Sequence, residues 1–433
     1  MKRISLKKTA AALSLGLLLC AAPLHVNAAA QWQDTLFDHY GIEANGFVET
    51  RGGVRLQDDP FEKQYTIAET RLQLDMLKDL KWGFLKMKGD LLGDLVLEEI
   101  TPELRELNLQ FSPLDFVDVK VGRQVLTWGT GDLIFINDMF PKDWQSFFIG
   151  RHDEYLKSPS DAVKTSLYLD AVNIDLVYTP IFNNSQYISG ERLSYFSPLS
   201  TSFAGRNSPM DDDEPNSIDD AEFAARLSKN IEEIEIAFYA YSGFWKEPEG
   251  FNPSSGLAYY PRLSVYGCSA RTALLRGVGN VEAGYYDSRD NRDGSDPTGR
   301  NSEVRFLSGF ERELAHDFTG ALQYYLEWMQ DYPDYERAIR SLSSTMPLRD
   351  EYRHMLTLRL TKLAMHQNLV LSLFTYYSPS DRDGYIRPKA TYKINDHWSV
   401  EGGGNLFWGK ENHTFWGRFK KNNNLYAGIR YGF

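Results

Sequence analysis

Basic side chains near the C-terminal end of the chain are the first candidates for chemistry. Arg387, Lys389 and Lys393 stand at odd-numbered positions of one segment, so in an extended strand they point to one face. Arg359 and Arg430 hold similar positions in two other segments near this end. Guanidinium and ammonium groups that line a water-filled passage favour anions. These five residues are therefore candidates for the wall of a pore, with a hydrated, salt-bridged wall as the simpler alternative.

Residues 127–160 are a second candidate, because they combine many aromatic side chains with interspersed charges. Exposed to water, a loop this apolar would be an aggregation liability. We therefore expect it to fold into a protected interior and to narrow a passage there. A cap over a rim or a contact between subunits would hide the same side chains. The constriction candidates in this segment are Trp128, Asp132, Asp138, Lys142, Asp143, Trp144 and Arg151.

Catalytic and metal-binding motifs are missing from the sequence. It contains no G-x-S-x-G nucleophile motif, no H-E-x-x-H metal motif and no C-x-x-C-H haem attachment motif. Its acidic run at 211–214 is typical of solvated surface, with a Ca²⁺ or lipopolysaccharide-bridging role as the alternative. We expect a protein that is not an enzyme and that uses no cofactor and no metal.

The elements that position the candidate side chains are strands. Between 425 and 433, apolar residues at odd positions alternate with Arg430 and other residues at even positions, which is the period of a strand with one lipid-compatible face. The segment resembles the C-terminal strand of outer-membrane barrels, whose aromatic end is recognised by the barrel-assembly machinery. Tyr431 and Phe433 are the candidates for this assembly signal.

The same alternation recurs along the whole chain and predicts eighteen strands. Short connections alternate with long ones, as expected for periplasmic turns and outer loops. An even count places both termini in the periplasm. The sequence therefore predicts an all-β fold, a transmembrane antiparallel barrel over residues 41–433. The predicted strands are residues 41–51, 66–77, 81–91, 103–111, 116–126, 161–170, 172–181, 220–228, 232–243, 259–273, 278–288, 302–313, 316–329, 350–363, 366–378, 383–393, 396–408 and 423–433.

The first residues predict the compartment. Four basic residues, an apolar run and the sequence Val26-Asn27-Ala28 are typical of a secretory signal peptide over residues 1–28, and residues 29–40 form a short periplasmic lead-in. Cleavage removes four of 47 basic residues and none of 59 acidic ones, so the net charge moves from −12 to −16. This charge argues against nucleic-acid binding. Only Cys268 remains, which excludes a disulfide framework within the chain.

One short motif resembles a known family. Residues 121–126 read Val-Gly-Arg-Gln-Val-Leu and are followed by Trp128-Gly129. This resembles the Gly-Arg-Gln strand motif of the alginate-export-like and related porin-like outer-membrane barrels. The resemblance implies an eighteen-strand monomeric barrel that passes polymers or small solutes. The dense Arg and Lys lining of alginate exporters has no counterpart in the mixed charges of this chain, so no substrate residue is carried over.

These patterns together predict a porin-like channel of the bacterial outer membrane for small charged or polar solutes. The expected partners are outer-membrane lipid, lipopolysaccharide and the barrel-assembly machinery. Two alternatives remain: a sheath or exporter component that holds a periplasmic partner, and an outer-membrane hydrolase. A sheath usually needs a wider barrel, a clear pore would favour the channel, and a cluster of Ser, His and Asp at the outer rim would favour the hydrolase.

Overall fold

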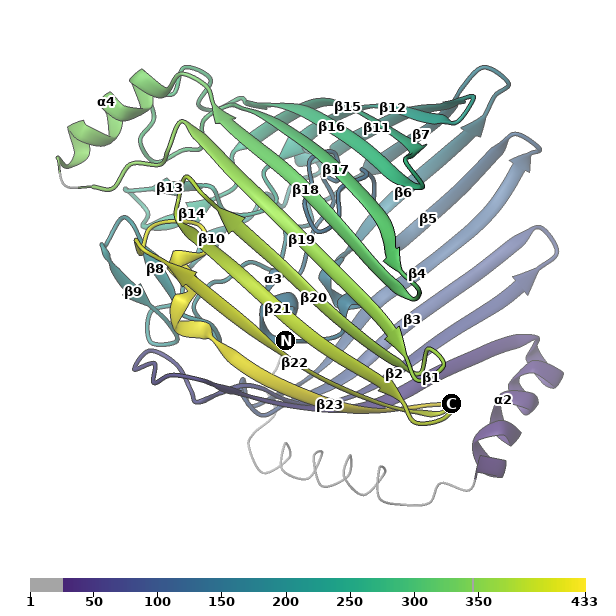
Figure 1. Cartoon of the computed structure of the whole chain (residues 1–433). Helices are drawn as coiled ribbons and strands as arrows, with labels where there is room; N and C mark the ends of the chain where they lie inside the picture. The colour runs from purple at the N-terminus through teal and green to yellow at the C-terminus, as the bar shows by residue number, and fades with distance from the viewer. Residues whose placement is uncertain (1–25, 345) are drawn as a thin grey trace.

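The computed structural model describes residues 26–344 and 346–433. Most of the predicted signal peptide, residues 1–28, lies outside the described residues, and cleavage after Ala28 stays a prediction. Among the described residues, eighteen strands form one sheet that closes on itself, with every neighbouring pair antiparallel. Figure 1 shows this sheet as a barrel, with α2 and the C-terminus at the same end.

The barrel strands follow one another in chain order, interrupted only by short strands in the long connections. The barrel strands are β1 (Ile42–Arg55), β2 (Tyr65–Leu80), β3 (Gly83–Asp94), β4 (Glu99–Leu114), β5 (Val117–Val125), β6 (Pro159–Tyr168), β7 (Asn173–Thr179), β11 (Glu222–Ile231), β12 (Ile234–Phe244), β15 (Arg262–Leu274), β16 (Gly277–Ser288), β17 (Glu303–Ala315), β18 (Phe318–Met329), β19 (Tyr352–Ala364), β20 (Leu369–Ser378), β21 (Asp383–Lys393), β22 (Trp398–Gly409) and β23 (Asn424–Gly432).

The remaining elements are short. The connections hold β8 (Tyr195–Ser197), β9 (Ser202–Ala204), β10 (Asp212–Asp213), β13 (Gly250–Asn252), β14 (Leu257–Tyr259), α3 (Trp144–Ile149), α4 (Tyr332–Leu342), η1 (Asp153–Leu156), η2 (Ile218–Asp220) and η3 (Gly417–Asn422). Helix α2 (Val26–Tyr40) precedes the barrel. No helix of the described chain is both long enough and apolar enough to cross a membrane.

The predicted fold class and the number of strands are confirmed. The largest differences in length are at strand ends: the segment predicted as 103–111 forms β4 over Glu99–Leu114. Of its extra residues, 99–102 pair with β3, whereas Leu114 pairs with Val117 of β5. The lead-in at 29–40 belongs to helix α2, in which Trp32 packs edge-on against Phe433 with ring centroids 5.9 Å apart.

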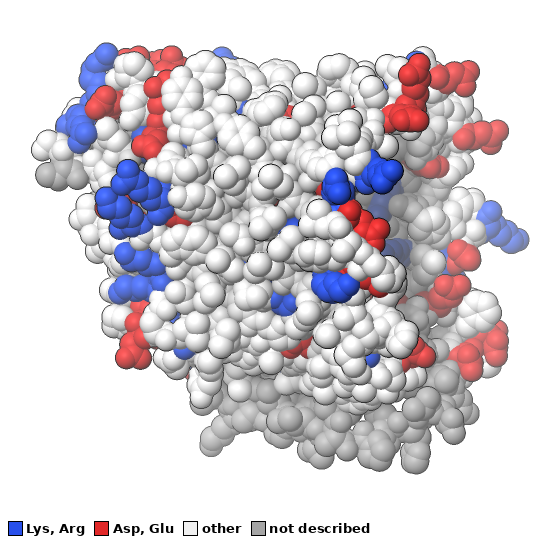
Figure 2. Space-filling view, in the orientation of Figure 1, with Lys and Arg blue, Asp and Glu red and all other residues white. Residues whose placement is uncertain are grey.

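Alternation along each strand separates an apolar outside from a polar inside. On β12, Phe238 is 59% exposed and its neighbour Tyr239 is 7% exposed; on β18, Leu322 is 56% exposed and Gln323 is 4% exposed. The face shown in Figure 2 carries a broad, mostly uncharged band across the middle of the barrel. A band of this size suits lipid rather than water, and a closed barrel leaves no strand edge unpaired in lipid. The chain is therefore a transmembrane β-barrel.

The first and last strands form the seam that closes the barrel. They pair from Phe47 with Gly432 to Arg55 with Asn424. Beyond this ladder, Gly46 and Phe433 exchange two backbone hydrogen bonds of 3.0 Å. A Cβ atom on Gly46 would lie 2.3 Å from the carbonyl oxygen of Gln73 and 2.8 Å from the Phe433 ring. The C-terminal aromatic ring therefore occupies the space that a side chain at position 46 would need.

We expect Gly46→Ala to destabilise the seam, because overpacking of this kind costs about 1–3 kcal/mol. The measurement is the folded fraction on unheated electrophoresis gels, together with the urea midpoint of unfolding. Gly52→Ala on the same strand is the matched control, since a Cβ atom at Gly52 meets no atom within 4 Å. Equal stability of the two variants would contradict the role of the Phe433 ring in closing the seam.

Candidate functional site

The connection between β5 and β6 reaches many parts of the inner wall. Its residues contact β1, β2, β16, β18, β19, β21 and β23, strands that are spread around the ring. A segment can touch all of these strands only from within the ring, and Figure 1 places α3 there. Loop 127–160, as we call this connection, therefore crosses the lumen.

Helix α3 forms at the centre of loop 127–160 for local reasons. Asp143 caps its first turn by accepting a 2.7 Å hydrogen bond from the backbone N–H of Ser146, and burial raises the pKa of Asp143. Gly150 ends the helix with φ +88°, and a Cβ atom there would overlap the ring of Tyr426. The loop thus approaches strand β23 so closely that only glycine fits.

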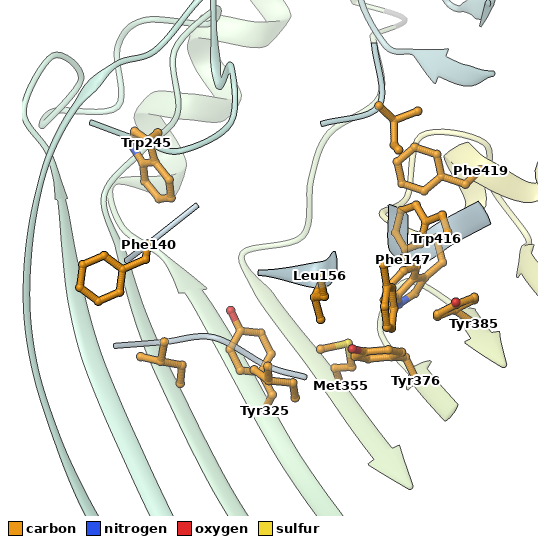
Figure 3. Close-up of a cluster of buried hydrophobic side chains, with 14 of the residues drawn as sticks. Phe140, Phe147, Leu156, Trp245, Tyr325, Met355, Tyr376, Tyr385, Trp416 and Phe419 are labelled. Carbon is orange, nitrogen blue, oxygen red and sulfur yellow. The ribbon is translucent and has the colours of Figure 1, made fainter. Parts of the chain in front are cut away.

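Aromatic rings of α3 join the loop to the wall. Phe148 packs edge-on against Phe407 and Tyr385, with centroids 5.1 and 5.7 Å apart, and also approaches Phe419 and Trp416. Figure 3 shows Phe147, Trp416, Tyr385 and Phe419 gathered on one side of this cluster. The apolar part of the loop is therefore buried against wall side chains, which accounts for its composition.

A single carboxylate holds the start of the loop. Glu282 on β16 accepts hydrogen bonds from the backbone N–H groups of Thr130, Gly131 and Asn137, at 2.9, 3.2 and 2.8 Å. The Asn137 amide and the Thr130 hydroxyl add two more, at 2.9 and 3.2 Å. Glu282 is 2% exposed and has no ion-pair partner among the described residues. Five donors from one loop segment replace the cation that a buried carboxylate would otherwise need.

Ion pairs fix the rest of the loop to basic residues of the wall. Asp132 pairs with Arg359 on β19 at 2.5 Å. Asp153 pairs with both Arg387 and Lys389 on β21, each at 2.5 Å, and these cations hold the pKa of Asp153 well below its usual range. Asp132 and Asp153 thus neutralise three of the five C-terminal basic residues.

The other two predicted basic residues differ in place. Arg430 pairs with Glu49 at 2.8 Å and with Glu154 at 3.3 Å, inside the barrel. Lys393 pairs with Asp396 at 3.0 Å beside the β21–β22 turn, away from the loop. Four of the five C-terminal basic residues therefore line the lumen, where each has a carboxylate partner and none is a free cation.

The remaining predicted constriction residues lie inside the barrel. Trp128 packs against Phe140, with centroids 5.0 Å apart. Lys142 pairs with Asp138 at 3.0 Å, and burial lowers the pKa of Lys142. Arg151 binds Glu69 on β2 through two hydrogen bonds of 2.6 and 2.9 Å.

Trp144 and the predicted assembly signal complete the predicted set. Trp144 begins α3 and lines a cavity. The assembly-signal candidates Tyr431 and Phe433 lie at the seam end, where Tyr431 packs against Trp398 with centroids 4.9 Å apart.

A cavity of about 620 Å³ lies between loop 127–160 and the long connections of the barrel. Aromatic and apolar residues, among them Trp144, Trp245 and Tyr376, share its lining with many charged groups. A smaller lobe of about 90 Å³ adjoins it, and both spaces share Trp144, Glu247, Glu249, Phe415 and Arg418. Most of these residues lie in loops, where no alternation marks them, so the sequence did not predict them.

One charged network braces the wall of this cavity. Glu303 accepts from Arg300 at 2.8 Å and Arg305 at 2.8 Å, and Arg349 reaches Glu303 and Glu327 at 3.2 and 2.9 Å. Arg305 also lies 3.9 Å from the ring centre of Tyr286. In the described part of the chain, no group of three or more His, Cys, Asp or Glu could hold a metal ion.

Comparison with known proteins gives likeness of fold. No protein-family model matches the chain, and no curated protein matches it. Among solved structures, OccAB1 of Acinetobacter baumannii has a TM-score of 0.55 at 6% identity and covers 91% of this chain and 97% of its own. OccD3 (OpdP) of Pseudomonas aeruginosa has a TM-score of 0.53 at 10% identity and covers 91% of this chain and 91% of its own. OccK5 (OpdH) of the same organism has a TM-score of 0.52 at 9% identity and covers 90% of this chain and 97% of its own.

We expect Glu282→Ala to loosen loop 127–160. Each buried backbone N–H group that loses its acceptor costs about 1–3 kcal/mol of folding free energy. We therefore expect residues 130–137 to leave the wall and to hydrogen-bond to water. Single-channel recordings should then show severalfold more current noise and a higher mean conductance than the unaltered chain. Glu235→Ala is the control, because among the described residues Glu235 on β12 pairs only with Arg226 of the wall. Unchanged noise in Glu282→Ala would contradict its anchoring role.

We expect Asp153→Asn to shift ion selectivity towards anions, because it adds one net positive charge where Arg387 and Lys389 meet the loop. The measurement is the reversal potential in a salt gradient. Asp396→Asn makes the same chemical change beside Lys393, which lies away from the loop, and should leave the reversal potential unchanged. Equal shifts in both variants would show that charge near the loop does not control selectivity.

Proposed function

We propose that this chain is a channel of the bacterial outer membrane for small polar or charged solutes, with loop 127–160 as its constriction. The carrying observation is a closed transmembrane barrel whose lumen is crossed by one anchored loop, with a charged and aromatic cavity beside it. Outer-membrane channels are among the solved structures that share the fold. Outer-membrane lipid, lipopolysaccharide and the assembly machinery are the partners that this location implies.

The path that we propose runs beside the part of the wall that the loop leaves uncovered. Strands β5, β6, β7 and β11 carry half-exposed lumenal charges with no contact to loop 127–160. Lys120 and Lys164 are direct cross-strand partners, an arrangement that costs stability unless water or anions screen it. Nearby carboxylates, Glu106 and Asp175, pair with them at 3.8 and 3.3 Å.

Solutes would diffuse along this wall, and its alternating charges would keep it hydrated. Because cations and carboxylates are interleaved there, we expect discrimination by size and by local charge pairing rather than by one strong sign of charge. The alginate-export-like relationship stays a prediction, since Arg123 of its motif pairs with Asp161 at 2.8 Å and shows no substrate role.

The alternatives find less support. A sheath needs an interior free to receive a partner, and loop 127–160 occupies that interior through contacts to many strands. For an enzyme, a nucleophile with a positioned base would have to face a cavity. The lining of the 620 Å³ cavity instead combines aromatic rings with charges, most of which are paired with one another or with neighbouring residues. We therefore propose that the chain acts as a channel without catalytic activity.

Deletion of residues 135–149 tests the proposal. Single-channel conductance of the refolded chain without residues 1–28 should be steady, and it should rise severalfold after the deletion, because the deletion removes the aromatic centre of the loop from the lumen. Deletion of 332–342, which removes helix α4 from an outer connection, is the control and should leave conductance unchanged. A barrel that is folded yet silent in all three forms would overturn the proposal.

A further inference from the structure

Two opposite charges without ion-pair partners meet at the junction of the two cavity lobes. The Arg418 side chain of η3 makes no hydrogen bond and no ion pair with any described residue, and its guanidinium only lies near the rings of Tyr195 and Phe419. Glu247, from the connection between β12 and β15, likewise has no ion-pair partner in the described chain. Both side chains line both lobes.

The electrostatics of the two groups show that they influence each other without being satisfied. Burial and the neighbouring Glu249 raise the pKa of Glu247 to about 7, against the opposite influence of Arg300, Trp144 and Arg418. Burial lowers the pKa of Arg418, although Glu249 and Glu247 act to raise it. Each group therefore lacks part of the counter-charge that it needs, and Glu249 cannot supply Arg418 fully because it already pairs with Arg300.

The smaller lobe adds an apolar requirement. Its lining includes Phe148, Ile188, Met210 and Phe419, and the aromatic rings of Trp144 and Phe415 border the junction. A ligand that satisfies the whole arrangement carries a carboxylate for Arg418, an ammonium for Glu247 and a short apolar group between them. Charge-assisted hydrogen bonds in a partly desolvated site are the strong ones, so both ends would contribute to recognition.

We propose that this junction is a binding site for zwitterionic α-amino acids with an apolar side chain, in which Arg418 binds the carboxylate, Glu247 the ammonium and the 90 Å³ lobe the side chain. The proposal rests on the proposed function, since it names the solute class of the same channel. It adds that both charges of the solute are recognised, at one place and before the constriction.

The first experiment measures binding by equilibrium dialysis, using the folded chain without residues 1–28 in detergent at pH 8, where Glu247 is mostly ionised. The probes are L-leucine, isocaproate, which lacks the amine, and isoamylamine, which lacks the carboxylate. We expect L-leucine to bind roughly tenfold more tightly than either analogue, the factor that accompanies one charged hydrogen bond. Equal binding of L-leucine and isocaproate would overturn the proposal, and so would no binding of L-leucine.

Variants separate the two ends of the site. Glu247→Gln should weaken L-leucine binding roughly tenfold and leave isocaproate binding unchanged or tighter, whereas Arg418→Met should weaken both and spare isoamylamine. Glu411→Gln and Lys410→Met are the matched controls, since these exposed residues line only the larger cavity. A loss of L-leucine binding in the controls as large as in Glu247→Gln would overturn the assignment to the junction.

Conductance measured on the same samples distinguishes this proposal from the proposed function. L-leucine binding by a barrel that conducts no current would support the binding site and overturn the proposal that the chain is a channel. The opposite outcome is steady conductance, no measurable binding, and an equal effect of L-leucine, isocaproate and isoamylamine on the current. It would support the channel and overturn the binding site.

Discussion

Backbone pairing in lipid is the constraint on which this structure depends. Eighteen strands leave no unpaired edge only because β1 and β23 meet, and their ladder continues to the last residue through Gly46 and Phe433. Closure separates an outer face that must be apolar from an enclosed interior that lipid cannot reach. The side of this boundary on which a residue of the wall or of loop 127–160 lies then determines whether its side chain must be apolar or can be charged.

The enclosed interior makes the wall and the loop depend on each other. Arg387 and Lys389 would be costly as unpaired cations at a partly buried site, and Asp153 of the loop would be costly without them. Glu282 shows the same dependence with neutral donors, since its hydrogen bonds come from the loop that it holds. Loop 127–160 is therefore held in place for electrostatic reasons, and the path that we propose follows the strands that the loop does not neutralise.

Period-two alternation let the sequence predict the number, order and facing of the strands, because each outward residue meets lipid and reports its position directly. The helix at 26–40 was missed, although Trp32, Leu36 and Tyr40 stand at helical spacing. The burial of loop 127–160 followed from its composition, but its partners did not. Asp132 and Arg359 are 227 residues apart and Thr130 and Glu282 152 apart, and only the closed ring brings them together. Cavity residues such as Arg418 lie in irregular connections, where no periodicity marks them.

Arg418 and Glu247 differ from the other charges of the interior in a way that bears on function. Arg151, Arg359 and Arg387 each have a carboxylate within hydrogen-bonding distance, so folding already offsets the cost of burying them. The chain places carboxylates next to these cations across more than 200 residues in two of the three cases. In the described part of the chain it leaves Arg418 and Glu247 without ion-pair partners at the junction of two cavity lobes, where we propose that a solute arriving through the long connections meets them. The other buried charges named here are paired within the protein. We therefore propose that a ligand, rather than the protein, supplies the counter-charges of Arg418 and Glu247.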